Sequence, residues 1–87
     1  MSSQEKEDKF ESARRQMVEF DLKGRDITEA KVLEAMARIP RQEFIPQQYK
    51  SQAYNDGPIP VGLGQTISQP YIVALMTQEL ELKLWLI

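Results

Sequence analysis

The chain has 87 residues, a length that fits one small domain or a piece of a larger one. Its hydrophobic and charged contents, 41% and 28%, are ordinary for a soluble globular protein, and its net charge of -2 gives no reason to expect nucleic acid as a partner. Cysteine and histidine are both absent, which excludes disulfides, thiolate metal sites, imidazole bases and Ser-His triads. We therefore expect no metal centre, no membrane segment, no signal peptide and a cytoplasmic location.

The first residues are polar, and an amphipathic pattern begins only after them. Residues 1–9 predict a disordered tail or a frayed first turn, and residues 10–87 predict a single helical unit. Apolar residues spaced three and four apart predict a helix that ends near Gly24. The apolar stripe consists of Phe10, Ala13, Met17 and Phe20. Within this helix, the Arg14–Arg15 pair fits either an anion site or a solvated face.

A second helix is signalled at both of its ends. Thr28 is the expected N-cap, and Ile27 before it is placed to pack against Val32. Pro40 predicts the end of the helix, because the residue before a proline is pushed out of the helical conformation. The apolar face of this helix consists of Val32, Ala35, Met36 and Ile39.

The middle of the chain predicts short elements and turns. Phe44 and Ile45 form a short hydrophobic anchor, and residues 47–54 fit one or two helical turns. A turn is predicted over Asn55–Pro58. Because prolines lack the amide donor, Pro58–Pro60 is expected to be extended at a loop edge or in an irregular strand, not in a central strand.

A third amphipathic helix is predicted to begin at Pro70, since proline is favoured in a first helical turn. Its apolar face consists of Ile72, Leu75, Met76 and Leu80. The final run, Leu82–Ile87, is too short to span a membrane. It fits either a buried strand or an apolar end that needs a partner.

The stretch Gly62–Tyr71 is the part of the sequence best suited to chemistry. The two glycines at its start permit a tight turn, and the side chains of Gln65, Thr66 and Ser68 offer hydrogen-bonding groups shortly before a helix N-terminus. Such a terminus suits a carboxylate or phosphate. Two interpretations of Ser68 stay open on the residues alone: an N-cap that contributes ~1 kcal/mol, or part of an anion or substrate site.

Three blocks of sequence, in this order, resemble the N-terminal region of protein-L-isoaspartate O-methyltransferases. The first is ITEAKVLEAMARIP at Ile27–Pro40, and the second is RQEFIP at Arg41–Pro46 with QAYNDGPIPVG at Gln52–Gly62. The third and most specific block is GQTISQPYIVALMTQELELK at Gly64–Lys83. Together the blocks extend the resemblance over most of the chain, from about residue 13 to residue 83.

The resemblance implies a fold, an activity and a site. The chain is expected to be mainly α, with about three helices and an irregular Pro/Gly loop, as the N-terminal part of a doubly wound α/β methyltransferase. The implied activity is protein repair by methyl transfer from S-adenosylmethionine to the carboxylate of isoaspartyl proteins or peptides. Ser68 matches the residue assigned to the active site, and Gln65, Thr66 and Ile67 would line the meeting point of cofactor and substrate. A carboxylate is ionised at neutral pH, so the transfer needs no strong base.

The sequence departs from the family after Lys83. In the family this position is followed by a strand and a Gly-rich cofactor loop, whereas in this chain it is followed by Leu84–Ile87. Gly62 and Gly64 do not replace that loop, because Ile67 occupies the third glycine position. We therefore expect a truncated form that is inactive alone and binds no S-adenosylmethionine by itself. The alternative is a non-enzymatic helical module that binds a partner or forms a homo-oligomer through the third helix and the C-terminal tail.

Overall fold

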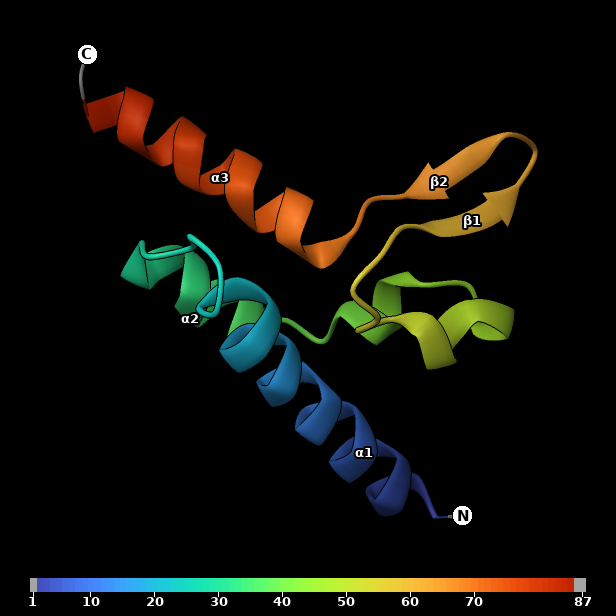
Figure 1. The fold of residues 1–87 in the computed structure, drawn as a ribbon. Helices are drawn as coiled ribbons and strands as arrows, with labels where there is room; N and C mark the ends of the chain where they lie inside the picture. The colour runs from blue at the N-terminus through green and yellow to red at the C-terminus, as the bar shows by residue number, and fades with distance from the viewer. Residues whose placement is uncertain (1, 86–87) are drawn as a thin grey trace.

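The computed structural model describes residues 2–85, with side chains through Glu81. It is mainly helical, as expected, with one small sheet that contains two strands within the described residues (Figure 1). The elements are α1 (Ser3–Gln16), the π-helix η1 (Met17–Leu22), α2 (Ala30–Arg38), the 3₁₀ helices η2 (Arg41–Phe44) and η3 (Gln47–Gln52), β1 (Ile59–Gly62), β2 (Gln65–Ile67) and α3 (Pro70–Trp85).

Helix α1 begins earlier than its apolar stripe indicated. The Ser2 hydroxyl accepts a hydrogen bond from the Glu5 amide at 3.2 Å, and this N-cap starts the helix at Ser3. Residues 3–9 are therefore helical in the structure, although the sequence suggested a disordered tail or a frayed turn. All of these residues are exposed, so capping and local hydrogen bonds rather than burial support this first part of α1.

A π-helical segment, η1, continues α1 and changes which residues face the core. Its hydrogen bonds close over five residues, so positions five apart share a face. Met17 and Leu22 are accordingly buried together, with Val18 beside them. Phe20, which α-helical spacing placed on the apolar stripe, is instead 70% exposed. The prediction that Phe20 faces the core was wrong, because it was based on the α-helical period.

Helix α2 lies where it was predicted, with a different N-cap. The carboxylate of Glu29, not Thr28, accepts the hydrogen bond from the Val32 amide at 3.0 Å. Ile27 and Val32 are both buried, as the predicted packing between them requires. The helix ends before Ile39, whose extended backbone leads into Pro40. Ile39 itself is 50% exposed and leaves the predicted apolar face.

The short helices η2 and η3 connect α2 to the hairpin, as the predicted turns over residues 47–54 indicated. Of the predicted hydrophobic anchor, Ile45 is buried but Phe44 is 74% exposed. Tyr54 is buried after η3, and its hydroxyl accepts a hydrogen bond from Arg14 Nε at 2.9 Å. The phenol therefore joins the end of η3 to α1.

Of the two alternatives for Pro58–Pro60, the irregular strand is confirmed at Ile59 and Pro60, and this strand is the first of a β-hairpin. Strands β1 and β2 pair antiparallel, and Ile59 lies opposite Ile67. The turn residues Leu63 and Gly64 have φ values of 54° and 72°, and positive φ at both central residues is what a tight type I′ hairpin turn requires. The pairing with β2 was not predicted, because Leu63, which is fully exposed, is not a residue type that indicates such a turn.

Helix α3 begins at Pro70, as predicted. The Gln69 carbonyl accepts the first helical hydrogen bond, from the Val73 amide at 3.1 Å, so Gln69 occupies the N-cap position. The N-cap interpretation of Ser68 is therefore wrong. Residues 82–85 continue α3, which contradicts the buried-strand alternative for them, while residues 86–87 lie outside the described part of the chain.

The core lies where η1, α2, α3 and the start of β1 meet the residues that follow η2 and η3. The N-terminal part of α1 and the tip of the hairpin extend away from it (Figure 1). Its buried apolar residues are Met17, Val18, Leu22, Ile27, Val32, Ile45, Ala53, Tyr54, Ile59 and Ala74. The predicted apolar face of α3 lies largely outside this core: Met76 and Leu80 are 67% and 59% exposed. Across the described residues, every helix is too short or too polar to cross a membrane.

Candidate functional site

Ser68 lies in the short link between β2 and the first turn of α3, and it is exposed. Its hydroxyl makes no hydrogen bond to any other group in the described residues. Its carbonyl, however, accepts a hydrogen bond from Arg41 Nη2 at 2.7 Å. The backbone of Ser68 is thus fixed while its hydroxyl stays available to a ligand.

Arg41 is the residue that joins this link to the body of the molecule. From the start of η2, its Nε donates to the Ala53 carbonyl at 2.6 Å while Nη2 donates to Ser68. A guanidinium serves two acceptors at once because its donors are held in a rigid fork. Burial lowers the pKa of Arg41 from its ordinary value, because partial removal from water disfavours the charged guanidinium.

The residue after Ser68 is held by a second contact, from the turn before the hairpin. Gln69 Nε2 donates to Asp56 Oδ1 at 2.8 Å. Arg25 Nη1 donates to the same oxygen at 3.0 Å, and its Nη2 donates to Asp56 Oδ2. The guanidinium of Arg25 and then the amide of Gln69 hold the pKa of Asp56 below its usual value.

Tyr71, in the first turn of α3, completes this set of contacts. Its hydroxyl donates to Asp26 Oδ1 at 2.6 Å, and the guanidinium carbon of Arg25 lies 5.0 Å from its ring centroid. Because the protonated phenol donates this hydrogen bond to Asp26, the pKa of Tyr71 is raised. The start of α3 is therefore tied to two separate turns, at residues 23–26 and residues 55–57.

The other predicted site residues form β2, and they do not share one surface. Gln65 and Thr66 are exposed, whereas Ile67 is partly buried against the core. Successive residues of a strand face opposite sides of the sheet, so Thr66 lies on the face away from Gln65 and Ile67. Ile67 thus packs the hairpin against the core, and Ser68 is the next residue in the chain.

The residues that hold this link in place were not predicted from the sequence. Arg41 and Asp56 fell within segments interpreted only as a connector and a turn, and Arg25 followed an expected helix end. Only the acidic residue within the turn motif Asn55–Pro58 was a signal, since such a side chain is well placed to accept hydrogen bonds from nearby donors. Nothing in the local sequence indicates the contacts of Arg41 and Arg25, because their partners are 27 and 31 residues away.

The comparisons with known proteins show the family of the chain. The family model described as Protein-L-isoaspartate(D-aspartate) O-methyltransferase matches residues 12–85, so the chain belongs to this family. It is 55% identical over 73 residues to Protein-L-isoaspartate O-methyltransferase 2 of Anaeromyxobacter sp. (strain Fw109-5), covering 84% of this chain and 30% of that protein. It is 51% identical over 76 residues to Protein-L-isoaspartate O-methyltransferase of Syntrophus aciditrophicus (strain SB), covering 87% of this chain and 35% of that protein.

A third relative, Protein-L-isoaspartate O-methyltransferase 2 of Marinobacter nauticus (strain ATCC 700491 / DSM 11845 / VT8), is 56% identical over 70 residues. The match covers 80% of this chain and 32% of that protein. The chain therefore spans about a third of the length of the curated relatives it matches.

S-adenosylmethionine, the cofactor that the family implies, does not fit the glycine-containing part of this chain. Gly62 and Gly64 flank the tip of an antiparallel hairpin, not a turn between a parallel strand and a helix. A Cβ atom added at either glycine would meet no other atom within 4 Å, so no ligand-sized cradle surrounds them. The residues described here thus offer the surroundings of Ser68 but no cofactor loop.

Proposed function

We propose that this chain supplies the substrate side of a protein-L-isoaspartate O-methyltransferase, a cytoplasmic enzyme of protein repair. The observation that carries the proposal is the state of Ser68: its backbone is held by Arg41, and its hydroxyl is exposed without a partner among the described residues. A hydroxyl in this state is available to donate a hydrogen bond to a substrate carboxylate. The family membership and the matching Thr-Ile-Ser-Gln-Pro sequence support the same role.

The proposed contribution of these residues is alignment of the substrate. An isoaspartyl carboxylate is already ionised at neutral pH, so it needs orientation more than deprotonation. Ser68 would donate to one carboxylate oxygen, and the first turn of α3 places helix N-terminal amides nearby. S-adenosylmethionine would be bound outside the described residues, by a part of the enzyme that corresponds to the remaining length of the relatives.

The first prediction tests Ser68 in a chimera that joins this chain to the remaining part of the Anaeromyxobacter relative. Ser68→Ala should reduce methylation of an isoaspartyl peptide about tenfold, because one hydrogen bond to a charged group contributes about 1.5 kcal/mol. The melting temperature should barely change, since the hydroxyl has no partner in the described residues. Thr77→Ala is the control, because its hydroxyl only donates to the Val73 carbonyl of its own helix. Unchanged turnover in Ser68→Ala would remove this residue from the site.

A second function, self-association as a helical module, is favoured by the uncovered face of α3. Four apolar residues of this one helix are between 37% and 67% exposed: Ile72, Val73, Met76 and Leu80. An apolar patch of this kind is characteristic of an interaction surface. The simplest closed assembly would be a two-fold dimer in which the patch meets itself.

The second prediction concerns this assembly. Light scattering of the chain should give a dimer mass that falls toward the monomer mass on dilution, because burial contributes ~25 cal/mol for each square ångström covered. Met76→Lys should shift the chain to monomer, whereas Lys31→Met, on α2, should not. A monomer mass at every concentration would rule out the self-association function and leave the enzymatic proposal intact.

A further inference from the structure

A groove runs along α1 on the side of η2 and η3. It has two neighbouring parts, of about 760 Å³ and about 300 Å³, which share the lining residues Phe10, Ala13 and Ser51. We call these two parts together the α1 groove. One wall extends from Ser3 on α1 to Asp21 on η1, and Ser68 is not part of the lining.

One residue in this lining has a hydrogen-bonding group without a partner. The Nε2 atom of Gln42 is buried and meets no acceptor among the described residues, although the whole residue is only 2% exposed. Its Oε1 accepts from the Tyr54 hydroxyl at 2.5 Å, and that hydroxyl accepts in turn from Arg14. Turning the amide over would leave its oxygen unpaired instead, so one polar atom of Gln42 lacks a partner in either orientation. A buried donor in this state costs free energy until an acceptor reaches it.

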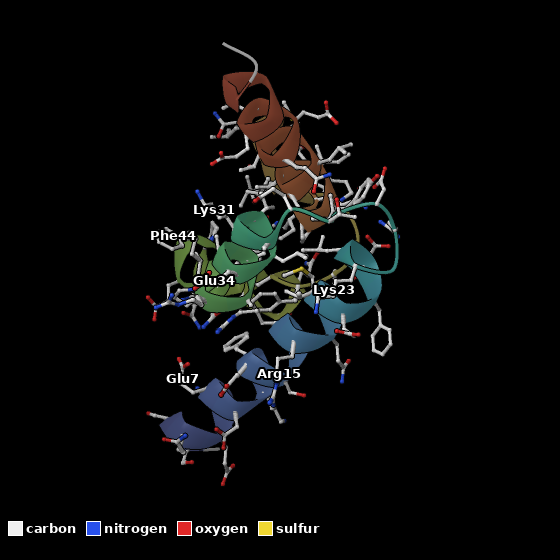
Figure 2. All side chains as sticks on the ribbon, turned by 90° about the vertical axis from the view of Figure 1, so that its left-hand side faces the viewer. Glu7, Arg15, Lys23, Lys31, Glu34 and Phe44 are labelled. Atoms are coloured by element: carbon white, nitrogen blue, oxygen red, sulfur yellow. The ribbon has the colours of Figure 1, made fainter. Side chains whose placement is uncertain are left out.

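The charges at this end of the α1 groove favour an anionic ligand. Lys6, Lys9 and Lys50 line it, and their ammonium groups form no ion pair within the described residues. Two carboxylates, those of Glu7 and Glu43, also line this part, which leaves it one net positive charge. The carboxylate of Asp21 lines the other part. Figure 2 labels Glu7 on the lower part of α1 and Phe44 on a neighbouring short helix. Glu7 and Glu43, the residue before Phe44, both line this part of the groove.

The shape favours an extended ligand. An α-helix rises 1.5 Å per residue, so the wall from Ser3 to Asp21 is roughly 27 Å long. An extended peptide advances about 3.3 Å per residue and would need about eight residues to span it. Phe10 and Ala13 at the junction of the two parts offer apolar contact for side-chain methylenes.

We propose that the α1 groove binds an extended acidic peptide segment. Carboxylates of this segment lie over Lys6, Lys9 and Lys50, and one of its oxygens accepts a hydrogen bond from Gln42 Nε2. The inference does not rest on the methyltransferase proposal, because the groove and the link that carries Ser68 are lined by different residues. Its test measures binding alone and is independent of methyl transfer.

The probe is a fluorescent eight-residue peptide in which aspartate alternates with alanine. The control peptide has asparagine in place of each aspartate. Fluorescence polarisation should show the acidic peptide binding at least fivefold more tightly, with the difference falling as salt is added. The double variant Lys9→Gln/Lys50→Gln should remove most of this difference. Lys23→Gln is the matched control, because Lys23 pairs with Glu19 at 3.6 Å and lies at the other end of the helical run from Glu7 (Figure 2).

Gln42→Met should weaken binding of the acidic peptide about fivefold, because it removes the unpaired donor. If Gln42→Met fails to fold, the lysine double variant still decides the question. Equal affinity for the aspartate and asparagine peptides would overturn the proposal. So would an equal loss of binding in Lys23→Gln and in the double variant.

Discussion

Replacing Gln78 with methionine should lower the free energy of unfolding by about 3 kcal/mol, from the loss of three hydrogen bonds at about 1 kcal/mol each. Gln78 is only 6% exposed, and from α3 its Oε1 accepts from the amides of both Thr28 and Glu29 at 2.8 Å. Its Nε2 donates to the Asp26 carbonyl at 3.0 Å. One side chain thus satisfies three backbone groups at the start of α2.

Methionine fills a similar volume but offers these backbone groups no partner, so buried donors and an acceptor are left unpaired. A loss of this size corresponds to a fall in melting temperature of roughly 12–24 °C for a domain of this length. Gln78→Glu should also destabilise the fold: its carboxylate still accepts from the two amides at a helix N-terminus, but its second oxygen faces the Asp26 carbonyl and cannot donate to it. Gln48→Met, at an exposed position, is the control and should change stability by less than about 0.5 kcal/mol.

Circular dichroism recorded during thermal and urea unfolding measures these differences in stability. A Gln78→Met variant that unfolds with the control would mean that water replaces the amide at the start of α2. In that case α3 would be held on α2 by its apolar contacts alone. Ala74, which is fully buried on α3, would then be the main contact residue of that helix.

Gln78 also illustrates what the sequence does not reveal. Helix α2 was predicted from local signals, namely a proline stop and apolar periodicity, and these signals act within one helix. The contact of Gln78 with residues near 28 joins positions about 50 apart, and nothing in the local sequence marks it. The glutamine occurs within a helix whose apolar residues suggested a different inward face. Local periodicity identified the helix but not its buried side.

The hairpin and the π-helical segment were missed for related reasons. At Leu63 the backbone takes a left-handed conformation that the residue type does not favour, so the turn is imposed by pairing of β1 with β2. In η1, the burial of Met17 with Leu22 follows a five-residue spacing that an α-helical pattern cannot contain. The Thr-Ile-Ser-Gln-Pro segment was recognised by family resemblance, while the residue that holds it, Arg41, was not.

The last prediction concerns Arg41, the only described residue whose side chain donates to the Ser68 carbonyl. Arg41→Met should lower the free energy of unfolding by about 2–3 kcal/mol, because hydrogen bonds from a charged donor to the carbonyls of Ala53 and Ser68 are both lost. Ala53 is fully buried, so water does not readily replace the lost donor there. Arg41→Lys should recover only part of this loss, since an ammonium lacks the fork that reaches both carbonyls.

In the chimera described above, Arg41→Met should also reduce methylation by more than Ser68→Ala does. The reason is positional: without Arg41 the link between β2 and α3 moves, and a displacement of 1 Å in a catalytic group costs about a hundredfold in rate. Arg38→Met is the matched control, because that arginine is exposed and pairs only with Glu34 of its own helix. If Arg41→Met destabilises the chain but the folded chimera methylates at the full rate, Arg41 supports the fold alone. The substrate carboxylate would then be oriented without a fixed position for Ser68.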